Sequence, residues 1–307
     1  MSQTKPSKFN QEAAPGNRRR LPAILAALRP KQWVKNVLVA AAALFTSDKP
    51  RTLTDYIPLI VAILVFCLVS GCTYIINDIR DVDNDRHHPK KKLRPIASGD
   101  LKISTALTFS IIGIVVGLTA AFWVGPKFLA ATIAYLVITL AYSLWLKHIV
   151  ILDVLTLASL FVIRAAAGAF AIQVGMSEWL LLCTLLLARF LGLAKRRGEV
   201  SAHGTSGSTR AILQEYSIPM LDQLLTIAAS SCIMAYTLYS FFSDTGKSHP
   251  YLMATIPFVL HGIMRYLYLI HKHGVGETPE ATLIEDKPLV VTVILYAIAA
   301  GVTTILH

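Results

Sequence analysis

Four side chains with oxygen ligands follow a strongly apolar run at helical spacing. They are Asn77, Asp78, Asp81 and Asp85. At about 100° per residue they share one stripe of a helix, and Asp83 points to the opposite side. Because three carboxylates on one stripe repel each other, a cation must neutralise them, and hard oxygen ligands suit Mg²⁺. The spacing therefore predicts a Mg²⁺ site made by these four residues, with the three aspartates as catalytic residues.

The composition predicts the class of protein that must position these residues. The chain has 307 residues, of which 54% are hydrophobic and only 15% are charged, and its mean hydropathy is +0.57. Ordinary soluble domains have about 45–50% apolar and about 25% charged residues. A charge deficit of this size excludes a soluble enzyme, a disordered chain, a collagen and a disulfide scaffold. We therefore expect an all-α polytopic membrane protein.

Nine segments are long and apolar enough to be expected as spanning helices, since a span needs about 20 mostly apolar residues. Residues 1–28 are expected to form a disordered basic cytoplasmic arm, and residues 29–307 a single nine-helix membrane domain. Pro30 suits a first helical position in the first span. The expected spans are 31–47, 57–79, 103–123, 127–146, 151–173, 177–195, 218–241, 250–271 and 288–306.

The distribution of basic residues predicts the orientation of these spans. Of the 29 lysines and arginines, 22 fall on the side that carries the N-terminal arm and the acidic motif. The positive-inside rule places that side, and therefore the predicted site, at the cytoplasmic face. Such a basic face also predicts contact with anionic phospholipid or with a polyanionic substrate. No aromatic-basic nucleic-acid module is visible, so nucleic acid is not an expected partner.

The acidic motif resembles the first aspartate-rich motif of the UbiA superfamily of intramembrane prenyltransferases. The resemblance extends over residues 29–306 and includes Tyr142-Ser143-x-x-x-Lys147 before the fifth expected helix. It implies a nine-helix bundle with a central cavity open to lipid, in which the motif holds Mg²⁺ against a diphosphate. It also implies that Tyr142 and Lys147 belong to the substrate site.

One segment departs from the pattern of that superfamily. A second aspartate-rich motif is expected after the sixth helix, but Ala194-Lys195-Arg196-Arg197-Gly198-Glu199 stands there. Helical phase puts Lys195, Arg196 and Glu199 on one face, with Arg189 on a similar side and Arg197 elsewhere. These cations could hold phosphate directly, without a second metal. Alternatively, they are a positive-inside anchor.

Further segments resemble the branch of the superfamily that transfers phosphoribose to a polyprenyl phosphate. They are residues 29–36, 92–99, 195–199 and 276–289. The resemblance implies 5-phosphoribosyl 1-diphosphate as donor, polyprenyl (decaprenyl) phosphate as acceptor and diphosphate as leaving group. The product would be a precursor of cell-wall arabinan (arabinogalactan biogenesis), made at the plasma (inner) membrane by a Mg²⁺-dependent glycosyltransferase.

Several basic residues are candidates for binding substrate phosphates. Charges inside apolar segments usually face a polar cavity or a partner, and Asp153 shares a helical face with Arg164. Arg265 lies on a stripe with His261, Tyr268 and Lys272, which is either a phosphate contact or an interhelical seam. The residues near the membrane surface are either phosphate ligands or snorkelling anchors. The candidates are Lys31, Lys35, Lys92, Arg94, Lys147, Arg164, Arg189 and Arg265.

Two other functions remain open. The first is a Mg²⁺-dependent prenyltransferase with a prenyl diphosphate donor and an aromatic or lipid acceptor, which lacks its second acidic motif here. The second is a transporter, which intramembrane charges favour but for which no internal repeat is found. The sequence leaves the oligomeric state open, although small residues at 165–169 would permit a homo-oligomer through close helix packing.

Overall fold

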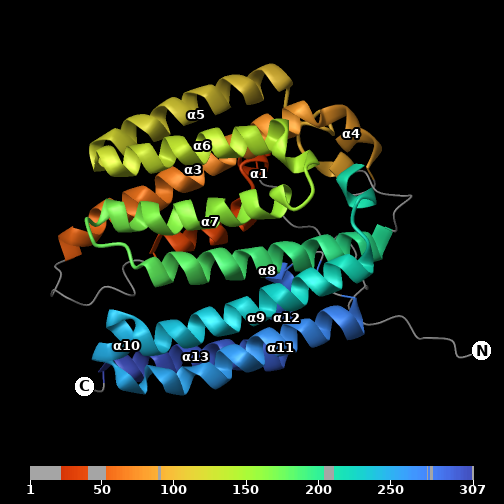
Figure 1. The fold of residues 1–307 in the computed structure, drawn as a ribbon. Helices are drawn as coiled ribbons and strands as arrows, with labels where there is room; N and C mark the ends of the chain where they lie inside the picture. The colour runs from red at the N-terminus through yellow and green to blue at the C-terminus, as the bar shows by residue number, and fades with distance from the viewer. Residues whose placement is uncertain are drawn as a thin grey trace, which may run out of the picture.

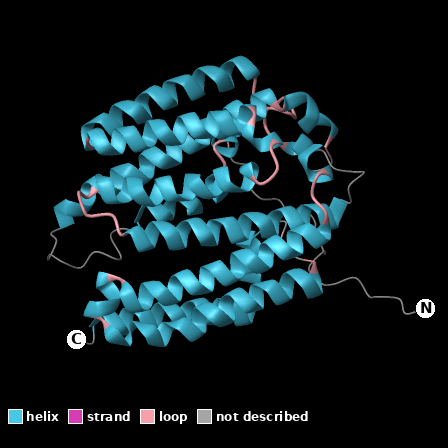
Figure 2. Cartoon of the chain, in the orientation of Figure 1, coloured by secondary structure: helices cyan, strands magenta, loops and turns pink. Residues whose placement is uncertain are grey.

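The computed structural model describes residues 22–40, 53–88, 91–203, 211–274, 276 and 279–305. Within these ranges every regular element is helical, and loops join the helices (Figure 2). The elements are α1 (Ala23–Ala27), η2 (Pro30–Ala40), η3 (Leu53–Tyr56), α3 (Ile57–Arg80), α4 (Val82–His87), η4 (Lys91–Leu93), α5 (Ile103–Val124), α6 (Pro126–Leu144), η5 (Leu146–His148), α7 (Leu152–Ala171), α8 (Glu178–His203), η6 (Ala211–Gln214), α9 (Ile218–Phe242), α10 (Asp244–Ser248), η7 (Pro250–Thr255), α11 (Ile256–His273), α12 (Pro279–Glu285) and α13 (Lys287–Ile305).

The long helices run roughly side by side in two groups (Figure 1). In the first group α3 packs against α5, α6 and α7, and in the second α8 packs against α9 while α11 packs against α9 and α13. The contact between α7 and α8 joins the two groups. Each group has its own apolar core, built around Phe66 and Phe128 in the first and around Phe190 and Leu225 in the second.

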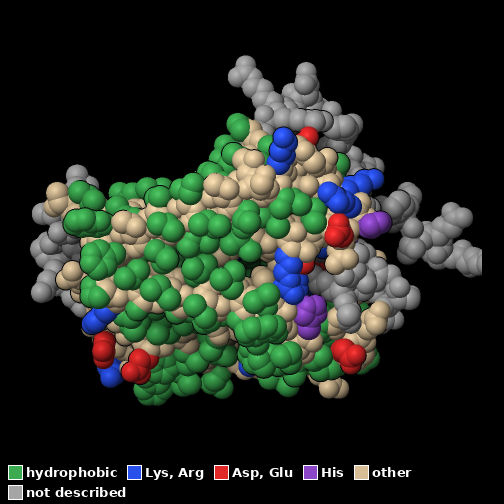
Figure 3. Space-filling model, turned by 90° about the horizontal axis from the view of Figure 1, so that it is seen from above, with side chains coloured by type: hydrophobic (Ala, Val, Ile, Leu, Met, Phe, Trp, Pro, Cys, Tyr) green, Lys and Arg blue, Asp and Glu red, His purple; other side chains and the backbone are tan. Residues whose placement is uncertain are grey.

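The outer surface of the bundle suits a hydrocarbon solvent. On α5, Ile111, Ile112, Val115 and Val116 are each more than half exposed. Hydrophobic side chains cover the middle of the face in Figure 3, and charged side chains gather toward its two ends. A helix that is apolar all round fits a membrane span, where each backbone group must be satisfied inside the helix.

Six described helices are long and apolar enough to cross a membrane. They are Ile57–Arg80, Ile103–Val124, Pro126–Leu144, Leu152–Ala171, Ile218–Phe242 and Pro250–Lys272. These correspond to six of the nine expected spans, and the chain is an all-α integral membrane protein.

The three other expected spans need separate description. The expected span 31–47 is described only to residue 40, as the 3-10 helix η2, and its remainder lies outside the described residues. The span expected at 177–195 is the long helix α8, which carries Glu178 in its first turn and Arg189 and Lys195 farther along. The last expected span, 288–306, corresponds to a shorter apolar helix, Lys287–Thr303.

The local sequence accounts for several helix boundaries. Proline stands at the first or second position of α3, α6, α9 and α11, where the missing N–H costs nothing. The Ser217 hydroxyl caps α9 by accepting from the Met220 backbone N–H. Gly125, with φ of 146°, allows the abrupt turn between α5 and α6.

Candidate active site

The acidic motif lies where α3 ends and α4 begins. We expected one continuous helix, but α3 ends at Arg80 and Asp81 stands in a turn with φ of −92° and ψ of 11°. The hydrogen bonds Asp81 N–H to Asn77 C=O and Asp85 N–H to Asp81 C=O keep helical spacing through the turn. Asp78 and Asp85 therefore still point to one side of the chain and Asp83 to the other, as the spacing predicts. The Asp78 and Asp85 side chains are 3% exposed, and that of Asp83 is 86% exposed. We call the end of the bundle that holds these residues the acidic end.

Four positive side chains from three separate segments surround the aspartates. Arg29 Nη2 lies 2.5 Å from Asp78 Oδ1, and Lys147 Nζ lies 3.2 Å from Asp81 Oδ1. Arg94 Nη1 lies 3.0 Å from Asp78 Oδ1 and 2.5 Å from Asp85 Oδ2. Lys91 Nζ lies 3.9 Å from Asp85 Oδ1, and Asn77 Nδ2 donates to Asp81 Oδ2 at 3.1 Å. Because these cations are about one-quarter exposed, a soluble anion can reach the cluster.

The acidic cluster carries the hard oxygen ligands that Mg²⁺ prefers, with Arg94 lying between two of them. One oxygen of Asp78 and one of Asp85 converge on the single nitrogen Arg94 Nη1, and a divalent ion needs the same convergence of hard oxygen ligands. In the described part of the chain no three acidic, histidine or cysteine side chains gather closely enough to hold a metal. Binding a metal there therefore requires Arg94 to give up the position between the two carboxylates.

Two residues with positive φ stand next to charged side chains, one in this cluster and one at the start of α7. Arg29, which contacts Asp78, has φ of 53°, and Ile151, which is β-branched, has φ of 69°. Positive φ at such residues costs free energy and persists only where surrounding contacts hold it. For Ile151 the contact is the Tyr216 hydroxyl, which accepts from the Ile151 backbone N–H at 2.7 Å.

Arg196 stands at the centre of a second, buried charge cluster. Its Nε lies 2.6 Å from Asp153 Oδ2, its Nη1 lies 2.6 Å from Glu199 Oε2, and its Nη2 donates to the Tyr142 hydroxyl at 3.2 Å. Tyr216 donates to the other oxygen of Asp153 at 2.8 Å. Burial raises the pKa of Tyr216, which keeps this hydroxyl protonated as a donor. Arg196 is 2% and Asp153 0% exposed, so the cluster locks α6, α7 and α8 together.

The rest of the cationic segment separates as helical phase predicts. Arg197 points away from Arg196, since its Nε lies 2.6 Å from Asp222 Oδ1. Lys195 is half-buried. Arg189 lies two turns before Arg196, and its buried Nε has no hydrogen-bond partner in the described structure.

Arg164 does not contact Asp153, with which it shares a helical face. Its Nε donates to Asn36 Oδ1 at 2.9 Å and its Nη2 to the Tyr135 hydroxyl at 2.9 Å. The guanidinium also lies over the ring of Phe161, 5.2 Å from its centroid. These contacts tie η2, α6 and α7 together inside the first group of helices.

Arg265 lies in a seam between α11 and α13. Its Nη2 is 2.8 Å from Asp286 Oδ2, and His261 on the same stripe is 2.8 Å from the Thr292 hydroxyl. Both contacts favour the interhelical alternative for this stripe. Its role toward substrate, like those of Lys31, Lys35 and Lys92, stays a prediction.

Sequence analysis did not select four residues of the two clusters. They are Arg29, Lys91, Asp153 and Tyr216. Asp153 carried a signal, because a carboxylate in an apolar helix needs a partner. Arg29 carried only its place in the segment 29–36 of the family resemblance, and Tyr216 carried none, because only the tertiary fold brings them to their partners.

These features define a polytopic membrane protein with a charged, partly open site at one end of an all-α bundle. The profile of the UbiA prenyltransferase family matches residues 36–281. The chain belongs to the UbiA prenyltransferase family.

Particular relatives and one solved structure agree with this assignment. The chain is 32% identical over 283 residues to decaprenyl-phosphate phosphoribosyltransferase of Mycobacterium tuberculosis, which covers 91% of this chain and 93% of the relative. It is 33% identical over 276 residues to the protein of the same name in Corynebacterium glutamicum, covering 87% and 82%. The structure of a UbiA homologue from Archaeoglobus fulgidus bound to GPP and Mg²⁺ superimposes with a TM-score of 0.69 at 17% identity, covering 92% of this chain and 99% of that one. At that identity the likeness shows the fold.

Proposed function

We propose that the protein transfers 5-phosphoribose from 5-phosphoribosyl 1-diphosphate to a polyprenyl phosphate, of which decaprenyl phosphate is the expected example, and releases diphosphate. The observation that carries the proposal is the identity of about one-third, along nearly the whole chain, to proteins named for this reaction. The cation-lined acidic end supports it, because donor and acceptor together bring several phosphates to one place.

Asp78, Asp85 and Asp81, with Asn77, would hold Mg²⁺ at the acidic end. Bound there, the ion supplies charge neutralisation for the donor diphosphate. The relative from Archaeoglobus fulgidus was solved with GPP and Mg²⁺, which supports the same metal here. The displaced cations Arg29, Arg94 and Lys147 are then available to phosphate oxygens.

The reaction exchanges one C–O bond for another. The bond from ribose C1 to the diphosphate oxygen breaks, and the electron pair leaves with the diphosphate. An oxygen of the acceptor phosphate, already anionic, forms the new bond to C1 and needs no general base. The side chains at the acidic end therefore act by positioning the reactants and stabilising charge.

The contacts of Arg196 favour one acidic metal site over two. All three of its guanidinium nitrogens contact side chains of the buried cluster, so a fixed cation occupies the place expected for a second acidic motif. A prenyltransferase that uses a second metal there is the less favoured alternative. In the phosphoribosyltransferase, Arg196 positions Tyr142 at the edge of the site.

We also propose how the protein lies in the plasma membrane. The nine expected spans include η2, α8 and α13, residues 29–307 form one membrane domain, and the acidic end faces the cytoplasm. The excess of Lys and Arg on the loops of that side supports this orientation.

A transfer assay tests the function. Radiolabelled 5-phosphoribosyl 1-diphosphate is mixed with purified protein in detergent, decaprenyl phosphate and Mg²⁺, and the label is extracted into organic solvent. Extraction of label that requires both lipid and Mg²⁺ supports the proposal. Absence of transfer by correctly folded protein, together with transfer of a prenyl group from a prenyl diphosphate, would overturn it.

A further inference from the structure

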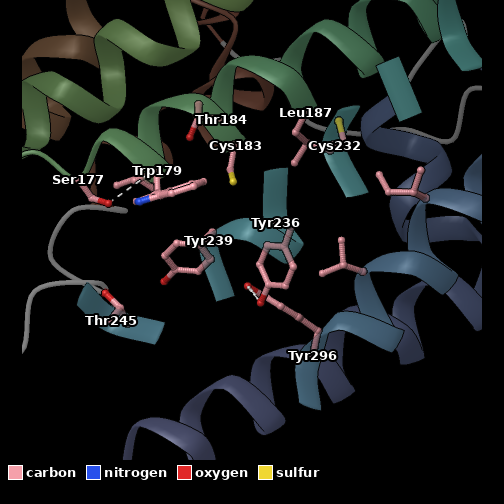
Figure 4. Close-up of a pocket in the computed structure, with 13 residues that line it drawn as sticks. Ser177, Trp179, Cys183, Thr184, Leu187, Cys232, Tyr236, Tyr239, Thr245 and Tyr296 are labelled. Carbon is pink, nitrogen blue, oxygen red and sulfur yellow. Dashed lines mark hydrogen bonds between the residues drawn. The ribbon is translucent and has the colours of Figure 1, made fainter. Parts of the chain in front are cut away.

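A cavity lies between α8, α9, α11 and α13, away from the acidic end. Its volume is about 270 Å³. Trp179 and Cys183 point into it from α8 and face Tyr236 and Tyr239 of α9 (Figure 4). The other residues that line it are Ser177, Leu180, Thr184, Leu187, Cys232, Thr245, Val259, Ile263 and Tyr296.

The cavity runs along the helix axes from one end of the bundle to its middle. Along α8 its lining extends from Ser177, just before the helix, to Leu187, which is about 15 Å at 1.5 Å per residue. Along the neighbouring helices α9 and α10, the lining extends from Cys232, in the middle of α9, to Thr245 in α10. Figure 1 places α10 at the end of the bundle opposite α4. The depth matches one leaflet, which is half of a hydrocarbon core about 30 Å thick.

The lining becomes more polar from the middle of the membrane toward that end. No lining residue is Asp, Glu, Lys, Arg or His, and Leu187, Cys232 and Ile263 form the inner part. The hydroxyls of Ser177 and Thr245 lie at the outer end. The Tyr236 hydroxyl lies farther in than these two (Figure 4) and is satisfied by Thr255 Oγ1 at 2.6 Å. A neutral, mostly apolar wall excludes a charged ligand, because burying an unpaired charge is costly.

We propose that this cavity binds one hydrocarbon chain of a phospholipid from the leaflet opposite the acidic end. The apolar inner part takes the chain, and the hydroxyls and the Trp179 indole N–H contact the ester region. Ligand pockets usually have volumes of about 300–1,000 Å³, so the present one fits a single chain and not a whole lipid. This site is separate from the acidic cluster and does not depend on the proposed reaction.

The tail of the polyprenyl acceptor fits this cavity less well. Its phosphate belongs at the acidic end, so its tail would enter from the middle of the membrane. The end of that tail, which is pure hydrocarbon, would then lie against Ser177 and Thr245. A phospholipid has its oxygen atoms at that level, and the polarity of the lining therefore favours it.

Photocrosslinking in vesicles tests the proposal. The protein is reconstituted with a phospholipid that carries a diazirine in one acyl chain, irradiated and mapped by mass spectrometry. We expect adducts on Trp179 and Tyr236, and Trp123, which is 83% exposed on α5, serves as the positive control for labelling from the bilayer. Adducts on Trp123 without adducts on Trp179 and Tyr236 would overturn the proposal, and this comparison needs no variant.

Variants and a second probe sharpen the test. Thr184→Trp fills the cavity and should lower the adduct yield on Tyr236 at least fivefold, whereas Thr226→Trp, the same exchange on an exposed face of α9, should not. A diazirine placed at the end of a polyprenyl phosphate should label Tyr236 weakly. Stronger labelling by that probe than by the phospholipid would assign the cavity to the acceptor and overturn the proposal.

Discussion

At the scale of single residues, the acidic end holds its carboxylates in a paired state that substrate binding must change. Arg94 Nη1 occupies the point on which Asp78 and Asp85 converge, and Lys147 neutralises Asp81. Without such partners, carboxylates this deeply buried would be costly. The same cations can transfer from carboxylate to phosphate oxygens, so that charge stays balanced when the metal and donor bind.

Replacing a carboxylate of this cluster should abolish turnover. Asp85→Asn keeps the size of the side chain but removes the charge that would hold the proposed metal, and we expect transfer to fall by about 100-fold or more. Asp83→Asn is the matched control, because Asp83 is 86% exposed and faces away. Initial rates of lipid-linked label measure both variants. Equal activity of the two variants would exclude the metal-binding role.

Arg196 should act on stability through the buried carboxylate of Asp153. Arg196→Met leaves Asp153, which is fully buried, without its cation, and loss of one partner from such a pair costs about 3–5 kcal/mol. We expect a large fall in Tm in detergent. Arg86→Met breaks an exposed pair with Asp83, worth about 0–1 kcal/mol, and should leave Tm nearly unchanged. Similar Tm values for the two variants would contradict this role.

At the scale of the elements, η2 is held against α7 by a close backbone approach. A Cβ added to Gly168 would overlap the Val39 carbonyl group, so the two elements meet only because this position has no side chain. The approach also brings Asn36 of η2 to Arg164. The small residues at 165–169 therefore serve internal packing at least at Gly168.

Gly168→Ala should separate these two elements. The backbone carbonyl of Val39 cannot rotate away as a side chain does, so overpacking should cost about 1–3 kcal/mol and lower Tm. Gly301→Ala adds a methyl group to an exposed helix position with open space around it and is the control. An unchanged Tm for Gly168→Ala would show that η2 does not pack against α7 in this way.

The seam between α11 and α13 gives a test of the two interpretations of Arg265. Because Arg265 pairs with Asp286 across the seam, we expect Arg265→Gln to lower Tm slightly and to leave the KM for the donor within about twofold. Arg94→Gln, at the acidic end, should raise that KM about tenfold or more, as a lost charge-assisted hydrogen bond does. A comparable rise for Arg265→Gln would assign it to the substrate site.

At the scale of the whole molecule, periodicity and composition predicted the features that are determined within a single segment of the sequence. They gave the membrane class, six spans that the structure confirms, and the facing of Asp78, Asp85 and Asp83. Periodicity and composition could not predict which side chains from distant segments contact each other. Arg29 is 49 residues from Asp78, and Lys147 is 66 residues from Asp81. Helical phase put Arg164 on the face of Asp153, but phase does not say which element lies opposite.

The orientation of the molecule in the membrane is the last prediction, and it follows from charge alone. With nine spans the N-terminal arm and the acidic end lie in the cytoplasm, and Thr245 lies outside. A cysteine introduced at Asp83, which is exposed, should react with a membrane-impermeant maleimide only in inverted vesicles, whereas one at Asp244, at the start of α10, should react in intact cells. The reverse pattern would place the acidic end away from the cytoplasmic donor and would require another function for its aspartates.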